Sequence, residues 1–167
     1  GGKALAGAHQ RQDHFKGRQV HEQAAKLSFP ELLQFYWENV SKPPTPVELR
    51  NRFIRHVLTD EERVRHFPVA GVRGAACLDI GCGAGAMQNV ANERFDVVFS
   101  ADVAFRWMVL ARKRLEKAGL PANVICCCAD YLPFRGESFD MVTGISLLEH
   151  TANAEAVVAE CGRVVKR

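Results

Sequence analysis

An acidic residue followed by three alternating glycines is the pattern in this chain with the clearest chemical meaning. Asp79 closes an apolar run, and Gly81, Gly83 and Gly85 follow at every second position. Glycines let a backbone turn tightly and approach a ligand at distances that a Cβ would block. A helix that starts just after them points its unpaired N–H groups into the turn. The pattern therefore predicts a cradle for a nucleotide cofactor.

Alternating strands and helices must position this cradle. The residue patterns predict strands over 75–80, 95–101, 123–129 and 139–146, with helices over 86–92, 103–118 and 153–165. Such alternation implies an α/β fold with a doubly wound parallel sheet, helices on both faces, and these as its first four strands. Ligands of such sheets bind beyond the carboxyl ends of the strands, where the strand order reverses.

Polar residues that could serve a ligand follow each predicted strand. Asp79 ends the first strand, Asp102 the second, Asp130 follows the third, and Glu149-His150 follows the fourth. This convergence on one edge of the sheet weighs more than any single motif. A purely structural alternative exists for Asp102, which could cap the helix over 103–118.

The first third of the chain differs from the rest and predicts an N-terminal helical cap over residues 1–66. Residues 21–40 have a helical pattern with a break near Pro30. Capping-box patterns at Thr45–Glu48 and Thr59–Glu62 indicate two further helix starts. The alternating α/β pattern then defines a second domain over 67–167.

Composition excludes several classes of protein. The net charge of +3 is too weak to indicate a nucleic-acid-binding protein. The longest apolar run, Val124–Ala129, is too short to span a bilayer. Six cysteines without a C-x-x-C pair favour free thiols and no metal centre. With no leader pattern either, we expect a cytoplasmic protein without a membrane partner. A chain that starts at Gly1 and stops at Arg167 within a repeating pattern is expected to belong to a longer protein.

Four further motifs resemble successive signatures of one enzyme family. They are Leu132-Pro133-Phe134, Ser138-Phe139-Asp140-Met141-Val142, Leu147-Leu148-Glu149-His150 and Glu160-Cys161-Gly162-Arg163-Val164-Val165-Lys166. Together with the acid and glycine pattern, they resemble class I S-adenosylmethionine-dependent methyltransferases of the small-molecule, type-11-like branch, over residues 67–167. The resemblance implies a Rossmann-like fold whose last strands would follow Arg167, which would leave the fourth strand as an exposed edge.

The resemblance also implies roles for particular residues in holding S-adenosylmethionine. Asp79 would serve its amino-acid end, Asp102 its ribose hydroxyls, and Asp130 its adenine amino group, with Tyr131 and Leu132 forming a wall beside the adenine. Cys82 would fill a small slot as an unreactive thiol. The full expected cofactor-binding set is Asp79, Gly81, Cys82, Gly83, Gly85, Asp102, Val103, Asp130, Tyr131 and Ser146.

Two assignments keep alternatives. Asp130 lies two residues before Leu132, whereas the family places its adenine-binding acid about four residues before the Leu-Pro-Phe motif. Matching without a gap therefore puts Cys128 at the position of that acid. We favour Asp130, because a thiol replaces a carboxylate acceptor poorly. His150 is a candidate catalytic base, with a solvent-exposed histidine as the alternative. A related metal pattern, Glu-x-x-Glu-His, lacks its first acid because position 146 is Ser, so no metal is expected.

The sequence favours methyl transfer from S-adenosylmethionine to a small molecule at oxygen, nitrogen or carbon. A nicotinamide-dependent oxidoreductase is the first alternative, because Gly81-x-Gly83-x-x-Ala86 also fits a dinucleotide turn. A cofactor-binding remnant without turnover is the second. The expected partner is a small-molecule substrate; nucleic acid is disfavoured, and a homodimer is left open.

Overall fold

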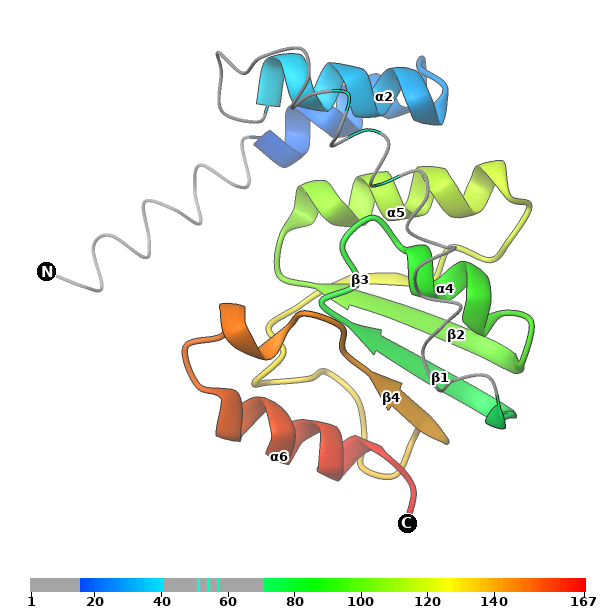
Figure 1. Ribbon diagram of the computed structural model, residues 1–167, viewed down its shortest axis with the longest axis vertical. Coiled ribbons are helices and arrows are strands. Elements are labelled where there is room, and N and C mark those ends of the chain that lie inside the picture. Colours follow the sequence, from blue (N-terminus) through cyan, green and yellow to red (C-terminus); the bar gives the residue numbers. More distant parts are fainter. Residues whose placement is uncertain (1–15, 41–50, 52–53, 55–56, 58–70) are drawn as a thin grey trace, which may run out of the picture.

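A parallel sheet forms the centre of the computed structural model, which describes residues 16–40, 51, 54, 57 and 71–167 (Figure 1). In this part of the chain the strand order is β3-β2-β1-β4, and every pairing is parallel. The strands are β1 (Gly74–Ile80), β2 (Phe95–Asp102), β3 (Val124–Cys126) and β4 (Met141–Thr143). The order reverses between β1 and β4, which confirms the predicted doubly wound sheet.

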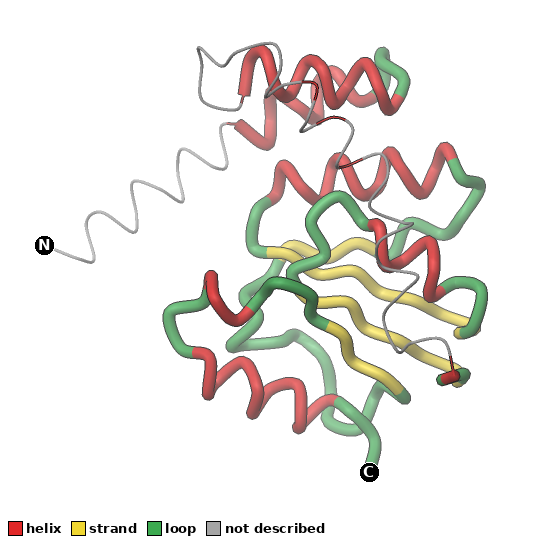
Figure 2. The backbone as a smooth tube through the Cα atoms, viewed as in Figure 1, coloured by secondary structure: helices red, strands yellow, loops and turns green. Residues whose placement is uncertain are grey.

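Alternation along β1 explains why both faces of the sheet are covered. Cys77 is fully buried on one face with Met87 and Val90 of α4 (Ala86–Ala91). Its neighbour Leu78 points to the opposite face, where the buried cluster includes residues of α6 (Ala154–Val164). Helices therefore lie on both sides of the sheet, as Figure 2 shows.

The strands β3 and β4 are shorter than the ranges 123–129 and 139–146 that the sequence predicts. Past Cys126 the chain leaves the ladder after one more bond, from Cys127 N–H to Asp102 O at 3.1 Å. Past Thr143 it meets Gly144 and then Ser146, whose φ of 51° is incompatible with a strand. Both strand ends are thereby diverted at the edge of the sheet where the site was predicted.

Helix α5 (Phe105–Lys117) begins two residues later than predicted, with Ala104 as its N-cap residue. Asp102 is still paired in β2, opposite Cys126, so it cannot itself be the cap. Its Oδ1 instead accepts a hydrogen bond from Ala104 N–H at 2.9 Å. The start of α6 matches the prediction, because Asn153 accepts from Ala156 N–H at 3.1 Å.

Helices from the N-terminal part pack on α5. Residues 16–24 are helical, and α2 (Phe29–Phe35) continues into a π-helical turn, η1 (Tyr36–Val40). The predicted break falls at 25–28, and Pro30 lies in the first turn of α2, where its missing N–H costs little. Leu32 and Leu33 are fully buried in one cluster with Leu110 of α5. The capping boxes at 45–48 and 59–62 and the predicted boundary at 66/67 lie outside the described residues.

The last residues lie beside the start of β4. Phe139 and Val165 form a parallel bridge, Lys166 N–H donates to Phe139 O at 2.8 Å, and Lys166 Nζ contacts Asp140 Oδ1 at 2.7 Å. Apart from this bridge, β4 lies at one edge of the described sheet.

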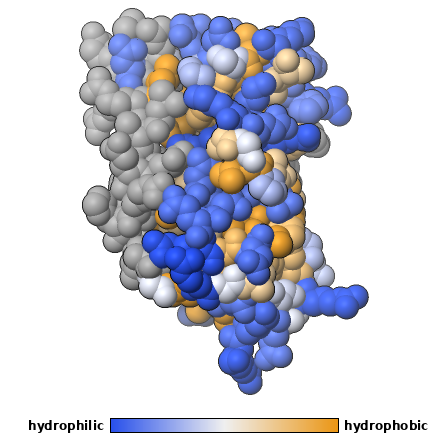
Figure 3. Space-filling model, turned by 90° about the vertical axis from the view of Figure 1, so that its right-hand side faces the viewer, coloured by the Kyte–Doolittle hydropathy of each residue, from blue (hydrophilic) through white to orange (hydrophobic). Residues whose placement is uncertain are grey.

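No helix in the described residues is long and apolar enough to cross a bilayer. The face in Figure 3 is largely hydrophilic with small hydrophobic areas.

Candidate cofactor-binding site

A cleft of about 680 Å³ lies beyond the carboxyl ends of the strands. Its walls come from the residues after β1, β2, β3 and β4, which the sequence placed at one edge of the sheet. Six of the predicted site residues line it: Gly81, Asp102, Val103, Asp130, Ser146 and His150. The volume falls within the range of pockets that hold cofactors and other small molecules.

The glycine turn that closes one side of the cleft needs its glycines. Gly81, Gly83 and Gly85 have φ values of 66°, 52° and 77°, in the region that side chains disfavour. A Cβ on Gly81 would lie 2.8 Å from Cδ1 of Leu147. The turn is anchored to β2, because the N–H groups of Gly81 and Cys82 donate to Ala101 O at 2.8 and 3.1 Å.

Asp102 joins this turn to the start of α5. Its Oδ2 accepts from Gly83 N–H at 3.1 Å, and its Oδ1 accepts from Ala104 N–H at 2.9 Å. Each carboxylate oxygen has a second lone-pair direction that can accept another donor. The two amides therefore fix a carboxylate at the cleft in a position to accept a pair of neighbouring hydroxyl groups.

Asp79 lies beneath the turn rather than on the cleft surface. Only 3% of the residue is exposed, and its Oδ1 accepts from Thr143 Oγ1 at 2.9 Å. Asp79 thus links the end of β1 to β4, and it is absent from the residues that line the cleft. Its predicted contact with the amino-acid end of the cofactor stays a prediction.

The cysteine in the turn has an unreactive environment. Burial raises the pKa of the Cys82 thiol well above its ordinary value, and the carboxylates of Asp79 and Asp102 raise it further. A thiol in these surroundings stays protonated at neutral pH and is a poor nucleophile. Cys82, Gly83 and Gly85 shape the turn without lining the cleft.

The segment after β3 brings both candidates for the adenine acid to the cleft. Cys128 and Asp130 are exposed and line it together, so the assignment of the acid stays a prediction. Tyr131 is 82% exposed and borders a separate shallow hollow with Leu132, Glu160 and Arg163. The expected wall of Tyr131 and Leu132 is therefore not part of the cleft in this structure.

The segment after β4 forms the opposite wall. Ser146 has a left-handed backbone with φ of 51°, which for a residue with a Cβ is uncommon and is found more often at functional sites. Leu147 fits against Gly81 and Gly144, since a Cβ on Gly144 would lie 3.1 Å from Leu147 Cδ2. His150 ends the 3₁₀ turn η3 (Leu148–His150) and is exposed at the cleft.

Sequence reasoning missed Arg106 and Trp107, which also line the cleft. Arg106 Nε donates to the hydroxyl of Tyr36 at 3.2 Å, and the rings of Tyr36 and Trp107 lie 5.5 Å apart. These contacts connect η1 to the cleft. Their signal in the sequence is positional, because the first turn of the helix that follows Asp102 must border the ligand site.

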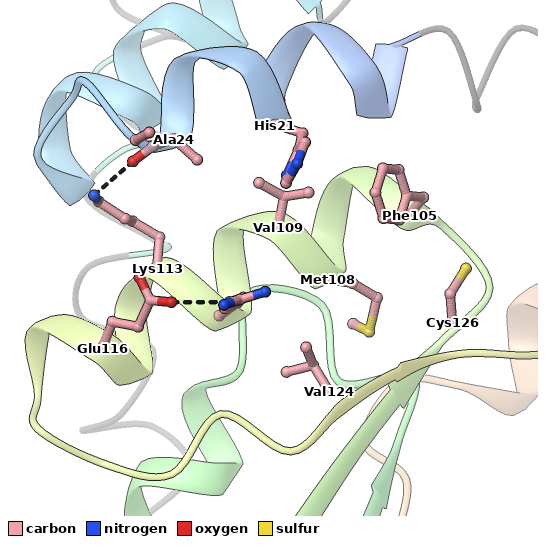
Figure 4. Close-up of a pocket in the computed structure, with 11 residues that line it drawn as sticks. His21, Ala24, Phe105, Met108, Val109, Lys113, Glu116, Val124 and Cys126 are labelled. Carbon is pink, nitrogen blue, oxygen red and sulfur yellow. Dashed lines mark hydrogen bonds and ion pairs between the residues drawn. The ribbon is translucent and has the colours of Figure 1, made fainter.

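A second cavity of about 610 Å³ lies elsewhere, between the helix over 16–24 and α5. Figure 4 shows His21 facing Val109 across it, and Lys113 Nζ reaching Ala24 O at 2.6 Å. This cavity includes neither the glycine turn nor Asp102. The cleft at the carboxyl ends of the strands is therefore the better cofactor site.

Comparisons with known proteins agree with this geometry. The methyltransferase domain family matches residues 78–167, more than half of the chain. A ubiquinone biosynthesis O-methyltransferase of Agrobacterium fabrum is 30% identical over 101 residues, which cover 60% of this chain and 39% of the relative. The Coxiella burnetii protein of the same name is 25% identical over 149 residues, covering 87% of this chain and 57% of the relative.

A solved structure shows the same relationship. A putative methyltransferase from Bacillus halodurans superposes with a TM-score of 0.58 at 25% identity, covering 65% of this chain and 47% of that one. The chain thus spans between about two fifths and three fifths of the length of the curated relatives it matches. No support emerges for the nicotinamide-dependent alternative. The chain belongs to the class I S-adenosylmethionine-dependent methyltransferases.

Proposed function

We propose that this chain is the cofactor-binding part of an enzyme that methylates a hydroxyl oxygen of a small molecule. The observation that carries the proposal is the cleft itself, in which Asp102, Gly81 and Asp130 meet at the carboxyl ends of parallel strands. The preference for oxygen follows from the relatives, which are named as O-methyltransferases.

The residues present fit S-adenosylmethionine. The carboxylate of Asp102, held by two backbone amides, would accept the ribose hydroxyls. Val103 is 62% exposed at the cleft and offers an apolar surface to the adenine. Asp130 would accept the adenine amino group, and the left-handed turn at Gly81 lets the backbone approach the methionine part. When bound, the cofactor supplies a methyl group that its sulfonium has already made electrophilic.

The chain then has to orient the acceptor, exclude water and manage one proton. Methyl transfer to a hydroxyl oxygen would also require the hydroxyl proton to leave the acceptor. We assign that proton to His150, whose imidazole is exposed at the cleft. Trp107 and Arg106, which contact Tyr36, would border the acceptor.

The setting of the reaction is also part of the proposal. All six cysteines are free thiols, which fits the reducing cytoplasm. We propose a small-molecule acceptor rather than nucleic acid, since the formal charge is only +3. A homodimer is left to experiment.

The proposal is tested by incubating the purified chain with S-adenosylmethionine and a panel of phenols, carboxylic acids and amines. Mass spectrometry then follows methylated product and S-adenosylhomocysteine together. We expect phenol methylation that a His150→Ala variant slows by about 10²–10⁴-fold, the range of general-base catalysis. Cofactor binding without any product would favour a binding remnant over an enzyme.

A further inference from the structure

The segment between β3 and β4 carries one wall of the cleft although it has no strand or helix of its own. Its first residues, Cys127, Cys128, Ala129 and Asp130, line the cleft. Two residues after Asp130 the chain becomes buried, and Leu132 is only 4% exposed. The contacts that hold Leu132 therefore lie two residues from this wall of the cleft.

Two side chains of α6 form hydrogen bonds with the backbone of this segment. Leu132 N–H donates to Glu160 Oε2 at 2.7 Å, and Leu132 O accepts from Arg163 Nη2 at 3.0 Å. Arg163 Nη1 also donates to Phe134 O at 2.8 Å. Both backbone groups of one residue are thus bound by side chains 28 and 31 positions away.

The two side chains also fix each other. Arg163 Nε and Nη2 donate to the two carboxylate oxygens of Glu160 at 2.6 and 2.7 Å. This fork, which binds carboxylate and carbonyls at once, needs the planar guanidinium and cannot be reproduced by lysine. The pKa of the Glu160 carboxyl is lowered to about 2, mainly by Arg163 and then by Leu132 N–H.

Helix α6 connects these hydrogen bonds to the cleft. Val157, one turn before Glu160, is buried and lines the cleft. Residues three apart share a helix face, so the same face of α6 supports the cleft and the segment beyond it. Both side chains are partly exposed to solvent, with 40% of the Arg163 side chain and 18% of the Glu160 side chain exposed.

We propose that Glu160 and Arg163 are positioning residues that clamp Leu132 and thereby hold Cys128–Asp130 against the adenine end of the cofactor. This inference rests on the proposed function, because it assigns that wall to the adenine. The family motif that contains both residues is thereby given a role in ligand selection and not only in helix packing.

The test compares Arg163→Gln with Arg163→Lys, Glu160→Gln and a control, Arg112→Gln, which breaks an exposed ion pair on α5. The apolar anchors Leu132 and Phe134 remain in every variant, which favours folding. Calorimetry measures binding of S-adenosylhomocysteine and of its inosine analogue, which lacks the adenine amino group. Hydrogen exchange measures protection of residues 127–134.

We expect the unchanged chain to prefer S-adenosylhomocysteine by about tenfold, the effect of about one hydrogen bond. Arg163→Gln should reduce this preference to less than about threefold and speed exchange, Arg163→Lys and Glu160→Gln should be intermediate, and Arg112→Gln should change neither. An undiminished preference in Arg163→Gln overturns the proposal, even if the variant melts at a lower temperature. If the unchanged chain binds neither ligand, the proposed function fails, and the clamp is judged by exchange alone: unchanged exchange in Arg163→Gln overturns it.

Discussion

Replacing Asp102 with alanine should weaken both the fold and cofactor binding, with the larger loss in cofactor binding. The carboxylate accepts two backbone N–H groups, from Gly83 and Ala104, and its removal leaves both amides without this acceptor. We therefore expect a loss of about 1–2 kcal/mol in the free energy of unfolding. Loss of the bonds to the ribose should add about 1.5–3 kcal/mol to the binding free energy, a decrease of about 10- to 150-fold in affinity.

The ribose contact can be separated from the effect on the turn. Calorimetry of S-adenosylhomocysteine and its 2′-deoxy analogue should show that the unchanged chain prefers the ribose form, whereas Asp102→Ala binds the two within about a factor of two. Asp96→Ala is the matched control, because Asp96 is exposed on the same strand, remote from its carboxyl end. Equal discrimination by Asp102→Ala and the unchanged chain would refute the assignment.

Three further predictions concern the turn, a thiol and pH. Gly81→Ala should lower the free energy of unfolding by about 1–3 kcal/mol in thermal denaturation, because φ is 66° and Leu147 leaves no room for a Cβ. The control, Gly162→Ala in α6, places its Cβ in open space and should raise the free energy of unfolding by about 0.5–1 kcal/mol. Equal effects of the two substitutions would contradict the reasoning. Iodoacetamide at pH 8 should label Cys128, and bound S-adenosylhomocysteine should protect Cys128 from labelling because it lines the cleft. Cys77, whose pKa is raised by burial to about 12, should stay unlabelled. Cys126, which is exposed at the other cavity, should gain no protection from the ligand. The stabilisation from Glu160, whose folded pKa is lowered from 4.5 to about 2, is present above pH 4.5 and lost as pH falls toward 2. In Glu160→Gln, the free energy of unfolding measured with urea should depend less on pH in this range. Some pH dependence should remain, because the pKa of Asp140 beside Lys166 is also lowered. An unchanged pH dependence would contradict this reasoning.

The sequence predicts the elements well wherever local chemistry defines them. The start of α6 follows from Asn153, and the glycine turn follows from three residues that accept positive φ. The ends of β3 and β4 are poorly predicted, because hydrophobic runs continue past the last ladder bond. The start of α5 is missed by two residues, since the pairing of Asp102 with Cys126 is a long-range interaction.

The candidate site shows the same division. The residues at strand ends, Asp102 and Asp130, are found from order along the chain, because a parallel sheet brings all its carboxyl ends to one edge. The contacts of Arg106 with Tyr36 join residues 70 positions apart. Tyr131 is exposed beside the buried Leu132, whose partners Glu160 and Arg163 lie 28 and 31 positions away, and no local pattern encodes these contacts.

The central claim is that the cleft binds S-adenosylmethionine. Isothermal titration of the purified chain with S-adenosylmethionine, and with NADH in parallel, tests it most directly. The structure predicts saturable heat with S-adenosylmethionine and none with NADH. Heat with NADH alone, or with neither ligand, would contradict the claim.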